Sequence, residues 1–178
     1  MFWRKKKLHS ETPELTFVDP QFRRKSYSSA DWSGQTFEHF IPVGCRFHDC
    51  KFENVTFETA CFGGGLEDTL YSNCSFDRST IRSISPGHAR FESCSFRDVE
   101  IIQLLGFTVE MVECVVTGIV KQAFFNGAVP EEYVEVLGRD KNEFRGNNFS
   151  DATFVDVGFR TGIDLSLQEL PKEWRNET

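Results

Sequence analysis

The sequence contains no long hydrophobic run. No segment approaches the roughly 20 apolar residues of a membrane-spanning helix. The start, Met1–Trp3 followed by Arg4–Lys7, has positive charge but no apolar stretch long enough for a signal peptide. We therefore expect a cytoplasmic protein with no membrane span, in which a reducing environment keeps the six cysteines free of disulfides.

The sequence also lacks the motifs of the common catalytic and metal sites. It has no Cys-x-x-Cys pair, with which many zinc sites begin, and no G-x-S-x-G, P-loop or dinucleotide-binding fingerprint. Its four histidines are His9, His39, His48 and His88. The acidic residues are scattered, as is typical of a solvated surface. We therefore expect no enzyme activity, no metal and no cofactor. A pocket that gathered His88 with several carboxylates and a metal would favour an enzyme instead.

Tyrosine and tryptophan are scarce, with three residues each, whereas phenylalanine occurs 19 times. Such a bias toward one large apolar side chain indicates a slot that repeats along the fold. The length of 178 residues, with 39% apolar and 26% charged residues, suits one globular domain rather than a disordered chain. An internal repeat is therefore the pattern that decides the fold prediction.

Large apolar residues recur at every fifth position. Neither an α-helix, at about 3.6 residues per turn, nor a strand, with a period of about 2, sustains such a pattern. The residue two positions before each large one is usually small, as at Cys45, Cys50 and Ala60, and most of the remaining positions are polar. After Gly63–Gly65 the frame shifts by one residue. The residues in register are Phe17, Phe22, Tyr27, Trp32, Phe37, Phe47, Phe52, Phe57 and Phe62, then Leu66, Tyr71, Phe76, Ile81, Phe91, Phe96, Ile101, Met111 and Val116, and finally Phe144, Phe149, Phe154 and Phe159.

This order of a small residue, Asp or Asn, Leu or Phe, Ser, Thr or Arg, and any residue resembles the pentapeptide-repeat family over residues 15–118 and 142–164. The resemblance implies an all-β fold, a right-handed parallel β-helix in which four pentapeptides form each coil and the large and small residues point inward. About six coils are expected, stacked like strands about 4.8 Å apart. The predicted columns are Cys74, Cys94 and Cys114, then Phe76, Phe96 and Val116, and on the preceding face Phe52, Tyr71, Phe91 and Met111.

Interruptions of the repeat divide the chain. We expect a basic flexible tail at 1–14, the β-helix at 15–164, and a C-terminal cap and tail at 165–178. Residues 119–141 break the register, and Pro130 before two glutamates favours a loop or short helical excursion there. A tight corner is expected at Gly63–Gly65. Kinked, looped or thinned corners are expected at Pro42, Pro86 and Gly106, and the cap is expected from Leu165, Leu167, Leu170 and Trp174.

The irregular segments are the leading candidates for function, because loops on rigid scaffolds commonly carry binding sites. We expect a non-catalytic scaffold for protein–protein interaction, with another protein as its partner, no direct nucleic-acid contact, and a homodimer formed through a terminal cap. Cys61 lies outward in register and is a candidate reactive thiol. Cys45 and Cys50 point inward and His48 outward, which separates three residues of metal-ligand type. Candidate partner-binding residues are Phe124, Phe125, Glu131, Glu132 and Tyr133.

An acidic body follows a basic start. Residues 1–25 hold seven basic and three acidic residues, and the remainder holds 13 basic and 24 acidic ones. The family includes quinolone-resistance proteins that imitate duplex DNA, so a DNA-mimicking modulator of DNA gyrase or topoisomerase IV is the alternative function. Basic residues interrupt the outward faces, however, and negative charge also keeps a protein soluble. The basic start suits either an anionic surface or a disordered tail. The candidate acidic surface comprises Asp49, Glu53, Glu58, Asp77, Glu92, Asp98 and Glu100.

Overall fold

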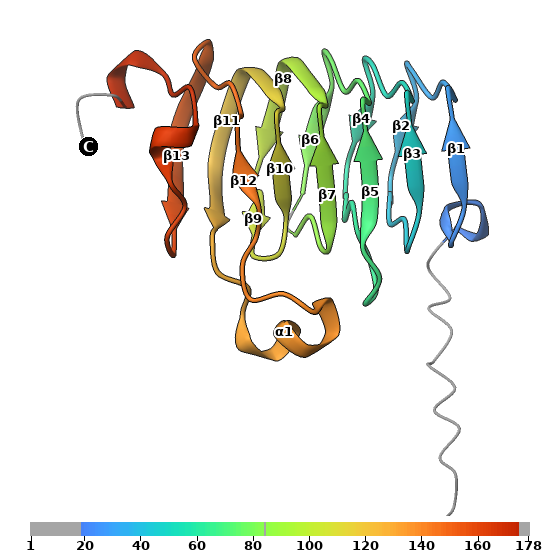
Figure 1. Ribbon diagram of the computed structural model, residues 1–178. Coiled ribbons are helices and arrows are strands. Elements are labelled where there is room, and N and C mark those ends of the chain that lie inside the picture. The colour runs from blue at the N-terminus through green and yellow to red at the C-terminus, as the bar shows by residue number, and fades with distance from the viewer. Residues whose placement is uncertain (1–18, 84, 175–178) are drawn as a thin grey trace, which may run out of the picture.

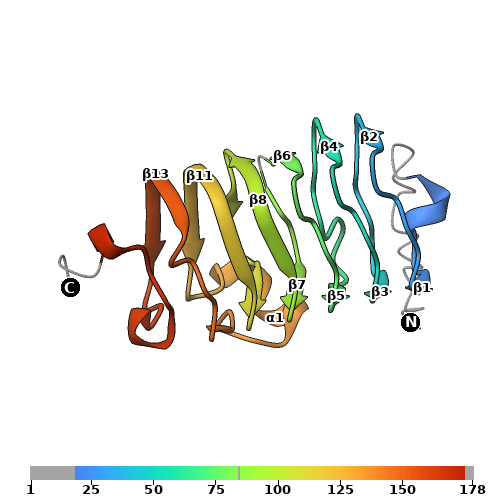
Figure 2. The same cartoon turned by 90° about the horizontal axis from the view of Figure 1, so that it is seen from above.

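The fold is a β-solenoid whose short strands stack along one axis. It was obtained as a computed structural model that describes residues 19–83 and 85–174. The strands lie in parallel sheets that form about 5 turns, one fewer than the sequence predicts (Figure 1). The view from above shows the same succession of coils from β1 to β13 (Figure 2). The expected basic tail at 1–14 and the first residue in register, Phe17, lie outside the described residues.

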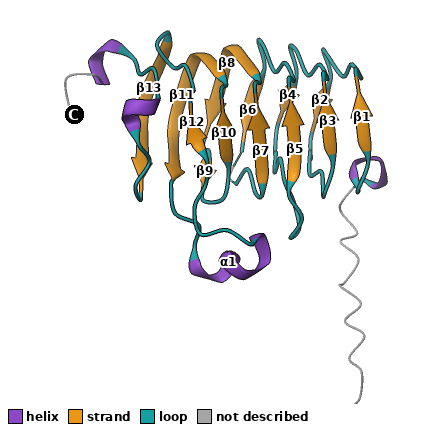
Figure 3. Ribbon diagram, viewed as in Figure 1, coloured by secondary structure: helices purple, strands orange, loops and turns teal. Residues whose placement is uncertain are grey.

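Two parallel sheets form the walls of the solenoid. The first sheet has the order β1 (Ser26–Ser28), β3 (Arg46–His48), β5 (Thr69–Ser72), β7 (Ala89–Glu92), β10 (Glu110–Val112) and β12 (Phe144–Arg145). The second has the order β13 (Ala152–Arg160), β11 (Val115–Asn126), β8 (Ser95–Ile102), β6 (Thr80–Arg82), β4 (Thr56–Phe57) and β2 (Thr36–Phe37), with β9 (Leu105–Gly106) paired to β11. The helical segments are α1 (Glu131–Leu137) and the 3-10 turns η1 (Pro20–Phe22), η2 (Leu165–Leu167) and η3 (Lys172–Trp174) (Figure 3).

The pairing register gives the length of each turn. Tyr71 pairs with Phe91, and Phe91 pairs with Met111, so each of these turns spans four pentapeptides. Phe47 pairs with Tyr71, so the turn between them is longer by four residues. The predicted column with Phe52 next to Tyr71 is therefore wrong, because Phe47 occupies this position.

The four additional residues lie in the segment 63–68. Gly63 still forms a parallel bridge with Gly87 of the following turn, whereas the Leu66 side chain is 56% exposed. Four added residues move a five-residue frame by one, which explains the shift in the sequence. The segment is thus an inserted loop rather than a tight corner, and Leu66 is not a core residue.

Stacked phenylalanine rings form the centre of the core. The Phe76 ring lies parallel to the Phe96 ring at 4.7 Å and to the Phe52 ring at 5.0 Å. Val116 follows in the same column, in register with Phe96. This column confirms the prediction for Phe76, Phe96 and Val116, and it forms because the backbone ladder repeats at nearly the separation that parallel rings adopt.

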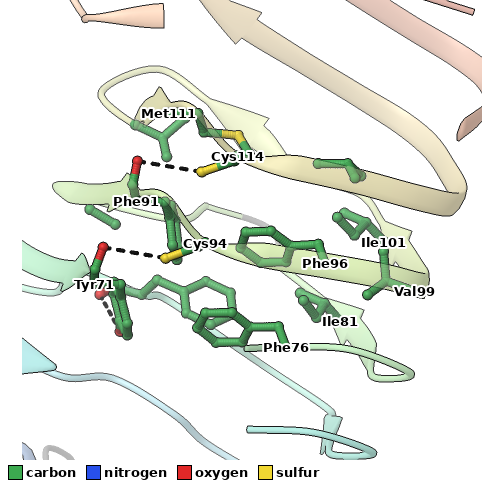
Figure 4. Packing of buried hydrophobic residues seen from close by; sticks show 14 of the residues in the cluster. Tyr71, Phe76, Ile81, Phe91, Cys94, Phe96, Val99, Ile101, Met111 and Cys114 are labelled. Carbon is green, nitrogen blue, oxygen red and sulfur yellow. Dashed lines mark hydrogen bonds between the residues drawn. The ribbon is translucent and has the colours of Figure 1, made fainter. Parts of the chain in front are cut away.

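A column of cysteines runs beside the rings. Cys94 donates from Sγ to the carbonyl oxygen of Tyr71 at 3.4 Å, and Cys114 donates to that of Phe91 at 3.6 Å (Figure 4). Cys74, Cys94 and Cys114 are all buried. A hydrogen bond with Cys94 raises the pKa of the Cys74 thiol, and burial raises the pKa of Cys94. Cys74 and Cys94 therefore stay protonated at neutral pH, and the buried column acts as a set of small core residues.

The C-terminal end of the core is capped. Trp174 packs edge-on against Phe154 at 5.4 Å and against Phe159 at 5.8 Å. Leu170 is buried, and Leu165 packs against the core. These three residues form the expected cap, because a solenoid must cover the apolar interior of its last coil. Leu167, the fourth predicted member, is 51% exposed and does not belong to it.

The excursion begins later than the sequence predicts. Strand β11 continues to Asn126 and pairs with β13, with Phe125 opposite Phe159. Residues 119–126 therefore belong to the solenoid, and the excursion is confined to 127–141. The pattern is obscured by a bulge between Val116 and Gly118, which shifts the next inward residue from the expected position 121 to Val120.

Candidate functional site

The interruptions of the repeat align on one face of the solenoid. Gly63 bridges Gly87, and Gly106 pairs with Phe125, so the inserted loop, the corners at positions 86 and 106, and the start of the excursion succeed one another along the axis. In Figures 1 and 3, α1 projects from the same side of the solenoid as the loop that precedes β5. We call this the irregular face and define it as residues 61–68, 85–88, 106–109 and 127–142.

Close backbone approach explains the glycine that starts the inserted loop. A Cβ atom at Gly63 would lie 2.3 Å from the carbonyl carbon and oxygen of His88. Only glycine lets the two neighbouring turns approach this closely. The loop therefore leaves the solenoid beside His88.

Asn142 fastens the excursion to the solenoid. Its side-chain Nδ2 donates to the carbonyl oxygens of Phe107 and Asn126, both at 2.8 Å. Its Oδ1 accepts a hydrogen bond from Arg139, whose Nη2 also donates to the carbonyl oxygen of Thr108 at 2.9 Å. Asn142 is 7% exposed, so these bonds are largely shielded from water.

A charge network lies beside this attachment, on β7, β10 and the residue that precedes β12. Arg90 pairs with Glu92 at 3.1 Å, with Glu110 at 3.2 Å and with Glu143 at 2.8 Å. Glu110 also faces Arg139 of the excursion at 3.7 Å. Burial alone would lower the pKa of Arg90, but hydrogen bonds with its three carboxylate partners raise the pKa overall. This network orients the excursion, because it joins Arg139 to the adjacent sheet.

A cleft of about 270 Å³ opens between the inserted loop and α1. Its apolar walls include Leu66, Phe107 and the ring of Tyr133. Leu66 is 56% exposed and Phe107 is 42% exposed, so both present apolar surface to solvent. The complete lining is Cys61, Gly63, Gly64, Gly65, Leu66, Ser85, Gly87, His88, Phe107, Thr108 and Tyr133.

His88, like Thr108, is a buried polar side chain of this cleft. It is 6% exposed, its Nδ1 lies 3.0 Å from Oγ1 of Thr108, and its ring meets that of Tyr133 edge-on at 5.1 Å. Burial lowers the pKa of His88; the charge of Asp68 opposes this shift, and that of Arg139 adds to it. His88 is therefore neutral at pH 7.

The structure separates the predicted partner-binding residues. Glu131 and Glu132 are exposed at the start of α1, and Tyr133 lines the cleft. Phe125 is a core residue, 3% exposed and packed against other core rings. Phe124 is 9% exposed and lies beneath the guanidinium of Arg160. The two phenylalanines are therefore not exposed anchors, because β11 extends through both.

The structure does not support the prediction that Cys61 is a reactive thiol. Cys61 lines the cleft but is only partly exposed, and burial raises the pKa of its thiol. Its thiolate fraction at neutral pH is consequently small, and Cys61 is therefore not a reactive site.

Cys45 and Cys50 are buried and His48 is exposed, as the register predicts. Among the described residues, no three His, Cys, Asp or Glu side chains gather as metal ligands.

Most of the candidate acidic surface is paired with arginine. Glu53 pairs with Arg78 at 2.7 Å, and Glu58 pairs with Arg82 at 3.1 Å. Asp77 and Glu92 face Arg97 and Arg90, while Asp49 contacts His48 and Asn73. Asp98 and Glu100 form no ion pair within the described part of the chain. The carboxylates thus alternate with positive charge instead of forming a continuous negative stripe.

Sequence reasoning missed several residues that build the irregular face. Leu66 follows three glycines in the inserted loop, which is a signal for an outward position that the five-residue count concealed. Phe107 stands one position after an in-register glycine. Asn142 and Arg139 carry no sequence signal, since the backbone carbonyls that attach them to the solenoid, those of Phe107 and Thr108, are distant in sequence.

Within residues 19–83 and 85–174, no helix has the length and apolar character needed to cross a bilayer. Comparison with models of known protein families gives no match to this chain, and comparison with curated proteins gives none either. The assignment of the site therefore rests on the geometry of the irregular face.

Proposed function

We propose that this chain is a non-catalytic member of the pentapeptide-repeat class, and that it acts as a rigid scaffold whose irregular face binds another protein. The five-residue repeat and the turns of four pentapeptides support membership of that class. The two parallel sheets supply continuous walls of the solenoid, which leaves the irregular face to carry loops. Loops on a rigid support are suited to binding because their positions are fixed in advance.

Exposed apolar side chains on this face carry the proposal. Leu66, Phe107 and Val136 are 56%, 42% and 47% exposed, and they come from the inserted loop, the turn after β9 and helix α1. Large exposed apolar side chains brought together from separate segments are typical of binding surfaces. The acidic Glu131, Glu132 and Glu135 lie on α1 together with Val136, which suits a partner with basic residues beside an apolar segment.

DNA mimicry is the less favoured function. It requires carboxylates that present phosphate-like charge to a basic groove. Arginines neutralise Glu53, Glu58, Asp77 and Glu92 on this surface. Unchanged gyrase supercoiling and quinolone sensitivity in the presence of the purified protein would remove this alternative.

The proposal is tested by comparing partner binding in two double variants. Leu66→Ser with Phe107→Ser removes apolar surface from the irregular face. Ile119→Ser with Val155→Ser removes similarly exposed side chains, 44% and 49%, from strands β11 and β13. Partners captured from a lysate by the wild-type chain would be purified, and their dissociation constants measured with each variant.

We expect the first double variant to bind about tenfold or more weakly, because buried apolar anchors dominate interface energies. The second double variant should retain wild-type affinity. Equal affinity of both variants for every purified partner would refute the irregular face as the binding surface.

A further inference from the structure

The hydrogen bonds of His88 fix the tautomer of its imidazole, so that one ring nitrogen is a hydrogen-bond acceptor. The hydroxyl of Thr108 donates its single proton to the carbonyl oxygen of Gly87 at 2.9 Å. Oγ1 of Thr108 also lies 3.0 Å from Nδ1 of His88. Because its own proton is already donated, Oγ1 must accept the proton that Nδ1 carries. In a neutral imidazole, Nε2 is then an unprotonated acceptor.

This acceptor belongs to a side chain that lines the cleft. Nε2 of His88 forms no hydrogen bond with any residue that the structure describes. The buried side-chain atom without a partner in this part of the chain is Nε of Arg139, so Nε2 of His88 is not sealed from solvent. A residue that is 6% exposed thus keeps an accessible acceptor in a cleft that it lines.

The walls of the cleft suit an aromatic ring. Leu66 and Phe107 provide apolar surface, and Tyr133 adds an aromatic side chain that already packs against His88. The volume of about 270 Å³ is just below the range of about 300–1,000 Å³ that is typical of pockets for drug-sized ligands. The cleft therefore suits one side chain better than a large cofactor.

We infer that the cleft receives a single aromatic side chain of the partner protein that carries an N–H or O–H donor, with Nε2 of His88 as its acceptor. Tryptophan and tyrosine are the side chains that combine a large apolar body with one donor, and both are enriched among interface anchors. The exposed Glu131, Glu132 and Glu135 on α1 favour basic residues beside that anchor. This inference rests on the proposed binding function and names the chemistry of its central contact.

Indole is the probe for this contact, and benzothiophene is its matched control. The two have the same fused-ring shape, but benzothiophene lacks the N–H donor. Binding to the full chain would be measured by NMR titration with ¹⁵N-labelled histidine. We expect indole to bind about tenfold more tightly than benzothiophene, because benzothiophene leaves the acceptor unpaired. We also expect indole to shift the Nε2 resonance of His88.

Two variants separate the acceptor from general apolar binding. His88→Phe should bind indole and benzothiophene equally, and the exposed His39→Phe should retain the wild-type preference. Thr108→Val keeps the histidine but removes the partner of Nδ1, so the ¹⁵N shifts should report a mixture of tautomers and the preference for indole should fall.

Equal binding of indole and benzothiophene to the wild-type chain would overturn the role of His88. Absence of any shift at His88 with either probe would overturn the cleft as the anchor site. The proposed scaffold function would survive both outcomes if the Leu66 and Phe107 variant still lost its protein partner.

Discussion

Replacing Asn142 by alanine should release the excursion without unfolding the solenoid. The change removes three hydrogen bonds: the one that Oδ1 accepts from Arg139, and the two of 2.8 Å that Nδ2 donates to the carbonyl oxygens of Phe107 and Asn126. An unpaired buried polar group costs about 1–3 kcal/mol, and water that enters beside the lifted excursion can satisfy part of the loss. We therefore expect the free energy of local opening of residues 127–141 to fall by about 2–3 kcal/mol.

Native-state hydrogen exchange measures this opening. The amide of Val129 donates to the carbonyl oxygen of Asp140 at 2.9 Å, within the excursion. A loss of about 2–3 kcal/mol corresponds to roughly 30-fold to 150-fold faster exchange of this amide. Amides of the stacked core, such as that of Phe76, should keep their protection.

Asn147→Ala is the matched control. Asn147 is also buried, and its Nδ2 donates to the carbonyl oxygen of Met111 at 2.8 Å, but its neighbours belong to the C-terminal cap. This variant should speed exchange of the Glu169 amide, which bonds to the carbonyl oxygen of Asn147, and leave Val129 unchanged. Exchange at Val129 within about threefold of wild type in Asn142→Ala would refute the role of Asn142 as the fastener.

Three further predictions concern stability. Phe76→Ala should cost about 4 kcal/mol in urea denaturation, because the ring is 0% exposed and stacked on both sides; a loss below about 2 kcal/mol would contradict this packing. Wild type should lose stability relative to His88→Phe as pH falls below about 6.5, by at most about 1.4 kcal/mol per pH unit. The reason is that the folded state, with its lowered His88 pKa, binds fewer protons than the unfolded chain; parallel pH profiles would contradict it. Val116→Ile should raise stability by about 0.8 kcal/mol by filling an internal apolar cavity of about 20 Å³ that Val116 lines, and a lower melting temperature would show overpacking instead.

The periodic part of the fold was predictable because its cause is local. One large residue and one small residue in every five suffice to place Phe76, Phe96 and the column of Cys74, Cys94 and Cys114, since each turn of four pentapeptides returns the chain to the same face. The errors arose where turns differ in length. Counting along the sequence could detect the shift of the frame after Gly65, but it could not distinguish an insertion of four residues from a deletion of one. The predicted column therefore placed Phe52 next to Tyr71, where the structure has Phe47.

The candidate site was only partly predictable, for a related reason. Glu131, Glu132 and Tyr133 could be placed on an excursion because Pro130 precedes an α-helical segment outside the repeat. His88 was visible as a histidine, but its contact with Tyr133 depends on how a much later segment folds back onto an earlier turn. Backbone carbonyls complete the attachment, and they are the same atoms in every residue type.

Nearest-neighbour stacking explains why the interruptions gather on one face. Each turn contacts only the turns next to it, so an insertion disturbs the ladder on its own face and leaves the other columns intact. The rings of Phe52, Phe76 and Phe96 remain parallel across the turn that contains the four added residues. A second insertion on another face would interrupt a second ladder of backbone hydrogen bonds. An insertion on the same face lies next to backbone that is already irregular, so it interrupts no further ladder. The segments 63–68 and 127–141 therefore flank one cleft because this arrangement interrupts the fewest strand pairs. The location of the proposed binding surface follows from the stacking of the core.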